Sequence, residues 1–403
     1  MRVGLFTREY PPHVYGGAGV HVDYLSRELA KTIQVEVHCW GTQQGDEGNL
    51  HVRGNEPWNA ISNGTEAKFK GALEALSLNL TQIKALAGID VVHTHTWYVS
   101  MAGYLAKKLY GMPFVMTTHS LEPLRAWKSE QLGSGYAMSS WMEHTAIHDA
   151  DGIIAVSQGT KDDILRAYPD IDPERIHVIY NGIDLNEYKK TKETKALVDY
   201  SVDPKIPYVL FVGRITRQKG VTHLVDAISH LPADTQVVLC AGAPDTPEIA
   251  AELRAKVDEA RKHHKRIVWI EKMVSTEEKI QLYSNCRVFC CPSVYEPFGI
   301  INLEAMACRA PVVASSTGGI KEVVVEDETG YLVPFTGDPV TGFPTDPVEF
   351  ARDLAARIDI LLHDPEKCRR FGDAGRQRVE QIFGWTAIAQ QTIALYKQLI
   401  ETR

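Results

Sequence analysis

Short continuous runs of apolar and β-branched residues recur along the whole chain, and segments with helical spacing lie between them. Continuous rather than alternating runs are what strands buried on both faces require. With helices between the strands, the pattern predicts a parallel sheet of six strands in each half, covered on both sides. The expected strands are Val3–Thr7, Val35–Trp40, Val91–His95, Phe114–His119, Ile153–Ser157, Ile176–Tyr180, Tyr208–Gly213, Val237–Gly242, Ile267–Ile270, Val288–Ser293, Pro311–Ser315 and Tyr331–Pro334.

The two halves open alike, each with a strand, a loop and an amphipathic helix. The first loop is the glycine-rich Tyr15–Gly19, and the second is Arg214–Gly220. This recurrence predicts two Rossmann-like α/β domains, joined through the turn and lysine-rich stretch at Asn181–Thr194. Loops at the carboxyl ends of the strands surround the crevice in such sheets, so we expect the functional site between the halves.

The expected domain boundaries follow from this junction. Residues 1–186 form the first domain and residues 187–385 the second. The helical segment at residues 386–403 either caps the second domain or crosses back to the first.

Composition narrows the class of protein. The 403 residues are 44% hydrophobic and 23% charged, as in a globular protein and unlike a disordered chain. The net charge of −8 argues against a nucleic-acid partner, which needs a basic face. Since no stretch is apolar enough to span a bilayer and the N-terminus has no signal-peptide pattern, we expect a cytoplasmic protein without a membrane partner. The 7 cysteines carry no C-x-x-C spacing and are expected to be reduced core thiols.

The strongest constellation is a pair of glutamates, Glu296 and Glu304, on either side of a Pro-Phe-Gly turn that follows a buried strand. We place Glu304 in the first turn of the next helix, whose free amides at Gly299, Ile300 and Ile301 can bind an anion. Carboxylates beside such a site are suited to holding sugar hydroxyls. The alternative is an ordinary capped helix with a solvated Glu296.

Two cations and two further glycine loops extend this pattern. Arg214 and Lys219 follow the first strand of the second half, where paired cations can neutralise a diphosphate. The Gly16-Gly17 and Thr317-Gly318 loops can present backbone amides to phosphate, although both also suit ordinary turns. The first loop departs from the G-x-G-x-x-G fingerprint, so a dinucleotide cofactor is a weak alternative.

Histidines gather at the ends of two expected strands, at His93, His95 and His119. We expect the His-x-His pattern to direct His93 and His95 to opposite faces of the sheet, and we therefore assign no metal ligand. The interpretation is a polar lining of the crevice, or for His93 a hydrogen-bonded core residue. The Asp170-Ile171-Asp172 motif has the D-x-D pattern of metal-dependent sugar transfer, but prolines on both sides predict a connecting turn.

These residues together resemble family 4 retaining glycosyltransferases of the GT-B fold. The resemblance rests on the glutamate pair, the Arg214 and Lys219 loop, and the N-terminal glycines, and it covers essentially the whole chain. Within this family the chain looks like the glycogen synthases of the actinobacterial type, a group that includes the α-maltose-1-phosphate synthases. The strings that carry this likeness are Thr7-Arg8-Glu9-Tyr10-Pro11-Pro12, Tyr15-Gly16-Gly17-Ala18-Gly19-Val20-His21-Val22, Thr118-His119-Ser120-Leu121-Glu122-Pro123-Leu124 and Cys240-Ala241-Gly242-Ala243-Pro244-Asp245-Thr246-Pro247.

The resemblance implies a GT-B α/β fold, two Rossmann-like domains facing across a cleft, with the C-terminal helix crossing back to the first domain. It also implies a donor site for ADP-glucose or UDP-glucose in the second domain. There Arg214 and Lys219 would bind the distal phosphate, Glu304 the ribose and Glu296 the glucose hydroxyls, while His119 would contact the glucose 6-hydroxyl. The implied donor-binding set is Gly16, Gly17, Arg214, Lys219, Glu296, Phe298, Gly299, Ile300, Glu304, Thr317 and Gly318, with His119, Arg214, Lys219 and Glu296 as the catalytic group.

The acceptor is an α-1,4-glucan or glucose 1-phosphate in this interpretation, and no cofactor or metal is expected. The bacterial glycogen synthases carry a Lys-Thr-Gly-Gly loop, whereas here Val14 and Tyr15 precede the glycines, which weakens the case for a glucan-elongating site. Arg8, Arg125 and Lys128, with His95, are candidates to receive a phosphorylated acceptor, or else are solvated surface residues.

A homodimer is a further possibility for the assembly of this chain. Alternatives are a GT-B enzyme with an inositol phosphate or lipid acceptor, and a sugar-nucleotide epimerase.

Overall fold

The computed structural model describes residues 1–402, apart from residues 15, 85, 126, 130–132 and 134. Tyr15, beside the expected glycine loop, therefore lies outside the described residues. The chain divides into two compact units, which are described separately below. Unit 1 comprises Met1–Gly182 and Trp385–Arg403, and unit 2 comprises Ile183–Gly384, so the division falls within the junction expected from the sequence.

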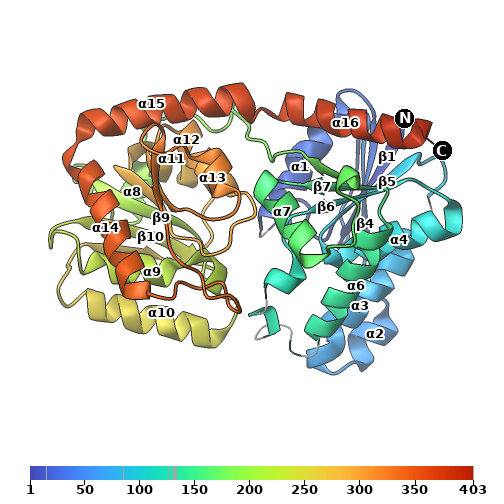
Figure 1. Cartoon of the computed structure of the whole chain (residues 1–403), viewed down its shortest axis with the longest axis horizontal. Helices are drawn as coiled ribbons and strands as arrows, with labels where there is room; N and C mark the ends of the chain where they lie inside the picture. The colour runs from blue at the N-terminus through green and yellow to red at the C-terminus, as the bar shows by residue number, and fades with distance from the viewer. Residues whose placement is uncertain (15, 85, 126, 130–132, 134, 403) are drawn as a thin grey trace. The chain divides into compact units, whose positions relative to one another are not determined.

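Unit 1 is built on an eight-stranded sheet with the order β3-β4-β2-β1-β5-β6-β7-β8 (Figure 1). Its strands are β1 (Arg2–Phe6), β2 (Gln34–Trp40), β3 (Gln44–Glu47), β4 (Leu50–Asn55), β5 (Val91–His95), β6 (Phe114–Thr118), β7 (Gly152–Ala155) and β8 (Ile176–Val178). Neighbouring strands from β4 to β8 are parallel. The strand order reverses between β1 and β5, and open α/β sheets bind ligands at such a switch point.

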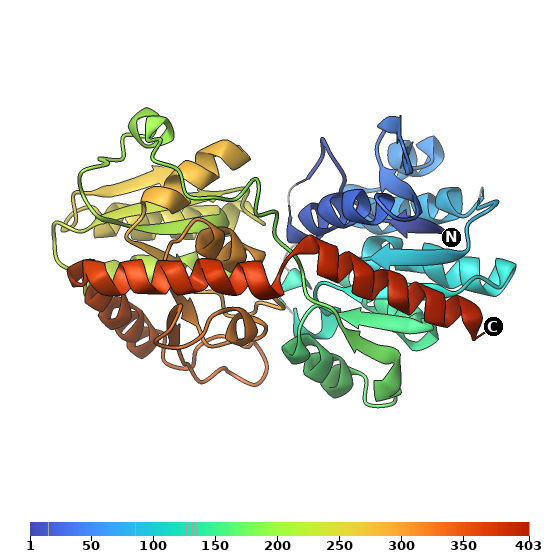
Figure 2. The same ribbon diagram turned by 90° about the horizontal axis from the view of Figure 1, so that it is seen from above.

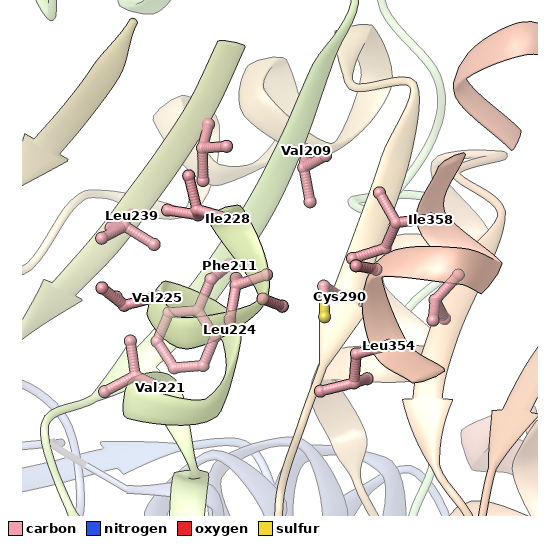
Figure 3. Packing of buried hydrophobic residues seen from close by; sticks show 14 of the residues in the cluster. Val209, Phe211, Val221, Leu224, Val225, Ile228, Leu239, Cys290, Leu354 and Ile358 are labelled. Carbon is pink, nitrogen blue, oxygen red and sulfur yellow. The ribbon is translucent and has the colours of Figure 1, made fainter. Parts of the chain in front are cut away.

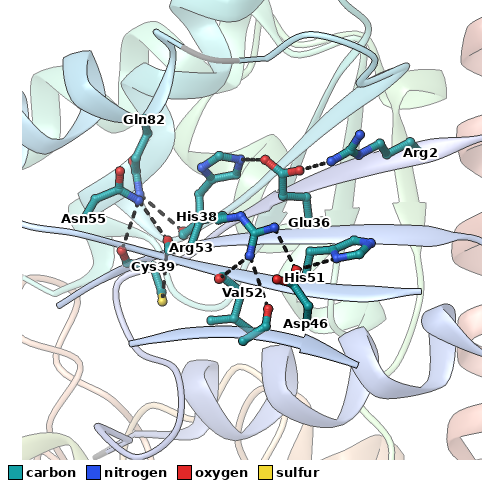
Figure 4. Close-up of polar contacts among 11 residues, drawn as sticks. Arg2, Glu36, His38, Cys39, Asp46, His51, Val52, Arg53, Asn55 and Gln82 are labelled. Atoms are coloured by element: carbon teal, nitrogen blue, oxygen red, sulfur yellow. Dashed lines mark hydrogen bonds and ion pairs between the residues drawn. The ribbon is translucent and has the colours of Figure 1, made fainter. Parts of the chain in front are cut away.

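The prediction of six strands in the first half was wrong, because β3 and β4 form an additional edge. β3 runs antiparallel to β4, and neither strand has a fully buried residue. Polar side chains hold this edge (Figure 4): Arg53 Nη2 donates to Asp46 Oδ1 over 2.7 Å, and His51 Nδ1 lies 2.6 Å from the same oxygen. A search for continuous apolar runs does not detect such an exposed edge.

Helices cover both faces of this sheet. They are α1 (Gly17–Ala30), α2 (Asn59–Gly64), α3 (Ala67–Gln82), α4 (Trp97–Tyr110), α6 (Gly135–Asp149), α7 (Gln158–Ala167) and α16 (Trp385–Glu401), with short 3₁₀ turns at Glu122–Leu124 and Pro173–Arg175. α16 lies beside α1 in unit 1 (Figure 2) and shares a hydrophobic core with it and with the sheet. The hydroxyl of Tyr396 on α16 lies 2.6 Å from Nδ1 of His93, so a buried polar contact joins the last helix to β5.

Unit 2 has a six-stranded parallel sheet with the order β11-β10-β9-β12-β13-β14, which confirms the six strands expected there. Its strands are β9 (Tyr208–Arg214), β10 (Gln236–Gly242), β11 (Ile267–Ile270), β12 (Val288–Cys291), β13 (Val312–Ser315) and β14 (Gly330–Val333). Numbered within the unit, the order is that of a dinucleotide-binding Rossmann sheet, and its switch point lies between β9 and β12.

The helices of unit 2 pack on both faces of its sheet. They are α8 (Lys195–Asp199), α9 (Val221–Ile228), α10 (Pro247–Ala260), α11 (Thr276–Asn285), α12 (Ile300–Ala307), α13 (Ile320–Val323), α14 (Pro347–His363) and α15 (Pro365–Ile382), with a 3₁₀ turn at Arg217–Lys219. Figure 3 shows Phe211 of β9 against Leu224 and Ile228 of α9, all of them buried. Burial of each such side chain stabilises the folded state by about 1.5–3 kcal/mol relative to leaving it exposed to water.

The cysteines are all free, and only Cys286 is not fully buried, as expected for core thiols. Among the described helices, none combines the length and the apolar character needed to cross a bilayer.

Candidate active site

A lysine–glutamate pair occupies the switch point of unit 2. Lys219 ends the loop after β9, and Glu296 lies in the loop after β12. Lys219 Nζ donates to Glu296 Oε2 over 2.6 Å, and the Ser293 hydroxyl donates to the same oxygen over 3.1 Å. Glu296 is only 6% exposed, so the alternative of a solvated glutamate is wrong. Glu296 Oε2 thus accepts a hydrogen bond from each of two side chains.

Backbone contacts hold these two loops together. Val294 N donates to the carbonyl of Gln218, which ties the loop after β12 to the Lys219 loop. Gly319 N donates to the carbonyl of Glu296 over 3.0 Å. Gly318 has a φ of +46°, and a Cβ there would overlap the same carbonyl, so glycine is required on both grounds. The Thr317-Gly318 loop therefore packs against the backbone of Glu296.

Glu304 lies in the second turn of α12, not the first as predicted, because the helix begins at Ile300. It is 3% exposed, and three side chains surround its carboxylate. Oε1 accepts from Tyr188 Oη over 2.9 Å and from Lys279 Nζ over 3.0 Å, and Oε2 accepts from Tyr283 Oη over 2.9 Å. The carboxylate is thus held in one orientation by donors from the protein itself.

Arg214, at the end of β9, is the second cation of the switch point. Its Nη1 donates to Asp245 Oδ1 over 3.1 Å, and its side chain is 26% exposed. Asp245 follows β10, and its side chain is only 6% exposed. The Asp245 carboxylate therefore helps to orient this partly exposed guanidinium.

The other residues of unit 2 that were predicted to bind the sugar donor lie at the start of α12 and in the loop after β13. Gly299 has a φ of +97° and precedes the helix, so glycine is needed where the chain turns into α12. Phe298 is buried, and its ring packs edge-on against Phe383, 5.8 Å between centroids, so it is a core side chain. The Thr317 amide donates to the carbonyl of Ser315, which is an intramolecular bond where the sequence predicted a phosphate donor.

In unit 1, a carboxylate already occupies the amino end of α1. Gly16 N donates to Glu9 Oε2 over 2.7 Å, and Gly17 begins the helix. A Cβ at Gly19 would collide with the Glu9 side chain. One of the amides expected to bind phosphate, that of Gly16, therefore binds Glu9, to which the sequence analysis gave no role. A carboxylate at a helix amino end is electrostatically favoured, and a bound phosphate would take its place.

Four histidines gather at the switch point of unit 1. His93 and His95 lie on the same face of β5, with ring centroids 4.2 Å apart, so the expectation that they point to opposite faces was wrong. Residues two apart on a strand share a face. His95 Nδ1 lies 3.1 Å from His119 Nε2, and the His21 ring from α1 contacts both.

Burial keeps these imidazoles neutral. It lowers the pKa of His21 to about 4. It also lowers the pKa values of His93, His95 and His119 well below the usual range, and the neighbouring rings add to the effect. Each ring therefore presents one N–H donor and one lone pair at neutral pH. His93 uses both nitrogens inside the protein, with Tyr396 and Thr117.

Of the three cations proposed for an acceptor, Arg8 and Arg125 are partly buried and Lys128 is buried. The Arg8 guanidinium lies over the rings of Tyr98 and Trp40, 4.2 Å and 5.1 Å from their centroids. Arg125 Nη1 donates to Ser120 Oγ over 2.9 Å, and Lys128 is 7% exposed. Packed cations of this kind are pre-oriented, which suits them to a phosphate better than freely solvated side chains.

The Asp170-Ile171-Asp172 motif forms a turn, as predicted. Asp172 Oδ1 accepts from Glu174 N over 3.0 Å and caps a 3₁₀ turn. Asp170 lies 3.1 Å from Nε2 of His148 on the protein surface.

Sequence reasoning missed most of the partners of the site. Asp245 and His21 lie within the sequence strings on which the family resemblance rests, but neither residue was given a role there. Tyr188, Lys279 and Tyr283 carry no motif, since only folding brings them to Glu304.

Both units of the chain are similar to known proteins. Residues 15–187 match a family model described as Glycosyltransferase Family 4, and residues 193–378 match one described as Glycosyl transferases group 1. The α-maltose-1-phosphate synthase of Mycolicibacterium smegmatis is 46% identical over 402 residues, which cover 99% of this chain and 100% of the relative. A glycogen synthase of Mycobacterium tuberculosis is 29% identical, over 98% of this chain and 94% of the relative.

Solved structures show the same architecture. Sucrose-phosphate synthase from Thermosynechococcus elongatus superimposes with a TM-score of 0.79 and 25% identity, covering 100% of both chains. The likeness therefore extends over both units.

Proposed function

Because the chain belongs to the family 4 glycosyltransferases of the GT-B fold, we propose that it transfers glucose, with retention of configuration, from ADP-glucose to glucose 1-phosphate. The observation that supports a donor site for the nucleotide sugar is the buried Lys219–Glu296 pair at the switch point of unit 2. There Lys219, a cation suited to phosphate, is hydrogen-bonded to Glu296, a carboxylate suited to sugar hydroxyls.

In this proposal unit 2 binds the nucleotide sugar. Arg214 and Lys219 neutralise the diphosphate, Glu304 holds the ribose, and Glu296 uses its outer oxygen for the glucose hydroxyls. The Glu296 carboxylate cannot rotate freely, because Ser293 and Lys219 bind one of its oxygens. A preoriented carboxylate of this kind favours one placement of the sugar.

Unit 1 binds the acceptor and supplies His119. The neutral His119 imidazole can hydrogen-bond the glucose 6-hydroxyl as donor or acceptor. Arg8, Arg125 and Lys128 supply positive charge for the acceptor phosphate, with His95 beside His119. The whole-length identity of 46% to α-maltose-1-phosphate synthases favours glucose 1-phosphate, and the 29% identity to a glycogen synthase makes an α-1,4-glucan the second candidate.

Retention is proposed to proceed on the front face of the sugar. The leaving diphosphate takes the acceptor proton while Arg214 and Lys219 stabilise its developing charge. A covalent route would need a carboxylate nucleophile. Two carboxylates lie close in sequence to the predicted site residues of unit 1: Glu9, near Gly16, and Glu122, near His119. Glu9 already accepts a hydrogen bond from Gly16 N, and Glu122 accepts one from Ser139 Oγ. No metal ion has a role in this transfer.

One incubation series tests the proposal. The purified chain is given ADP-glucose or UDP-glucose with either glucose 1-phosphate or glycogen, and the products are identified by mass spectrometry and anomeric NMR. We expect α-maltose 1-phosphate from ADP-glucose and glucose 1-phosphate at the highest kcat/KM. Elongated glycogen would favour the second candidate. Turnover of the donor without any acceptor would indicate an epimerase, and failure of every pairing would reject transfer to glucans or glucose 1-phosphate.

A further inference from the structure

Three histidines of unit 1 converge from three different elements. His21 comes from α1, His95 ends β5, and His119 follows β6 (Figure 1). One potential ligand atom from each ring lies within 4.8 Å of the corresponding atoms of the other two. The proposed transfer reaction gives no task to His21.

The hydrogen bonding of this cluster is incomplete. His21 is 3% exposed, and neither of its ring nitrogens makes a hydrogen bond; the same holds for the buried Nε2 of His95. The Asn181 side chain lies close enough to His21 to act on its pKa, against the effect of burial, but its Oδ1 makes no contact with hydrogen-bond geometry. A buried polar group without a partner destabilises the fold, because it has lost its hydrogen bonds to water. By contrast, His93 beside them has both of its nitrogens bonded.

We propose that His21, His95 and His119 form a binding site for one divalent transition metal ion of the Zn²⁺ class. Three imidazole ligands with a fourth position open to water or substrate is an established coordination for zinc. Nitrogens at the usual Zn–N distance of about 2.0–2.1 Å in a tetrahedron lie roughly 3.3 Å apart. The 3.1 Å between His95 Nδ1 and His119 Nε2 is already near that spacing. The other gaps are at most 4.8 Å, and binding of the ion would require the rings to rotate until these gaps close.

The ligand chemistry selects the ion. The cluster offers nitrogen ligands and no carboxylate, which suits zinc, nickel, cobalt and copper and disfavours Mg²⁺ and Ca²⁺. Metal-bound imidazoles usually donate the N–H of their second nitrogen to an outer acceptor. The unpaired Oδ1 of Asn181 is such an acceptor for His21.

Binding of the ion has a consequence for catalysis. It replaces the direct contact between His95 and His119, and it removes the His119 lone pair from the donor sugar. Zn²⁺ should therefore inhibit transfer while leaving the fold intact. This consequence rests on the role proposed for His119, whereas the binding itself does not.

Titration calorimetry with ZnCl₂ on the full chain, previously treated with a chelator, tests the site. We expect one Zn²⁺ per chain and no heat from MgCl₂ or CaCl₂. Co²⁺ in place of Zn²⁺ should give the intense visible absorption of a four-coordinate ion. His21→Phe keeps an aromatic ring in the packing and removes a ligand, so it should weaken Zn²⁺ binding by more than the roughly 10–100-fold typical of losing an outer-shell partner.

Matched controls separate this site from surface histidines. His263→Gln changes an exposed histidine and should leave Zn²⁺ affinity and the Co²⁺ spectrum unchanged. The absence of Zn²⁺ binding to the wild-type chain, or equal binding to the His21→Phe chain with an unchanged melting temperature, would overturn the proposal. If His21→Phe unfolds, the His119→Gln variant gives the same reading. Binding that depends on His21 without inhibition of transfer would support the site and reject the role assigned to His119.

Discussion

Lys219 Nζ donates to Glu296 Oε2 over 2.6 Å, although 77 positions separate the two residues in the chain. The pair is mostly buried, with side chains 21% and 8% exposed. It brings together a cation suited to phosphate and a carboxylate suited to sugar hydroxyls, as the proposed nucleotide-sugar donor would require.

Replacement of this lysine tests the donor site. Lys219→Ala should lower kcat by about 10²–10³, the typical cost of losing one preorganised charge-stabilising donor. Steady-state rates with ADP-glucose measure the effect. Lys256→Ala is the control, because Lys256 pairs with Asp226 over 2.6 Å with both side chains more than a third exposed. Equal kcat values for the two variants would remove Lys219 from the mechanism.

The carboxylate of Glu304 should matter for stability as well as for binding. Glu304→Gln leaves Lys279 and the two tyrosines without an anionic acceptor in a buried position, and should lower the free energy of unfolding by about 1–3 kcal/mol. Urea unfolding measures this. In Glu252→Gln, the loss of a surface pair with Arg217 should cost less than about 1 kcal/mol. An unfolding midpoint like that of wild type, together with a raised KM for the donor, would show that Glu304 acts on the ligand alone.

The Gly318 position should be intolerant of any side chain. Gly318→Ala meets both an unfavourable φ and the carbonyl of Glu296, whereas Gly342→Ala has a φ of +75° with open space around it. Both variants pay roughly 1–2 kcal/mol for the left-handed backbone. Only Gly318→Ala should also lower kcat/KM, since it displaces Glu296. Thermal melts and initial rates, measured on both variants, compare the two effects; equal loss of activity in both would contradict this assignment.

A buried carboxyl in unit 1 should make stability depend on pH. Burial, and then the neighbouring Glu122, raise the pKa of Glu143 from 4.5 to about 8. Between those pH values the unfolded residue is ionised and the folded one is protonated, so folding takes up a proton. The free energy of unfolding therefore falls as pH rises, by roughly 1.4 kcal/mol for each pH unit from this group.

Glu143→Gln removes that dependence and keeps the hydrogen bonds. Oε1 of Glu143 accepts from Glu122 N over 2.9 Å and from Tyr168 Oη over 2.7 Å, and a glutamine carbonyl can do the same. The variant should show a flatter plot of unfolding free energy against pH between 4.5 and 8. Glu277→Gln, at an exposed position, should keep the wild-type slope. If the Glu143→Gln chain kept that slope too, Glu143 would not be the titrating group.

Particular elements show why the sequence was sufficient for some of the fold. β9 and β12 are short, continuous apolar runs. The local residue pattern was therefore enough to predict both strands and the loops that follow them. β3 and β4 were not, because neither is a continuous run of buried apolar residues, and polar side chains such as Asp46 and Arg53 line this edge. The error on His93 and His95 was of another kind: the two-residue period of a strand already places both side chains on one face.

The sequence by itself determined the strands of both sheets other than the β3–β4 edge, because buried strands depend on local patterns of residue type. It also led to the proposal of Lys219, Glu296, Glu304 and His119 as site residues, from motifs and from the resemblance to a family. Only the tertiary structure decided what those residues touch. Tyr188 and Tyr283 reach Glu304, and His21 reaches His119, from elements distant in the chain. Such contacts depend on how helices pack on a sheet, and side-chain packing is a property of the whole fold that no local spacing records.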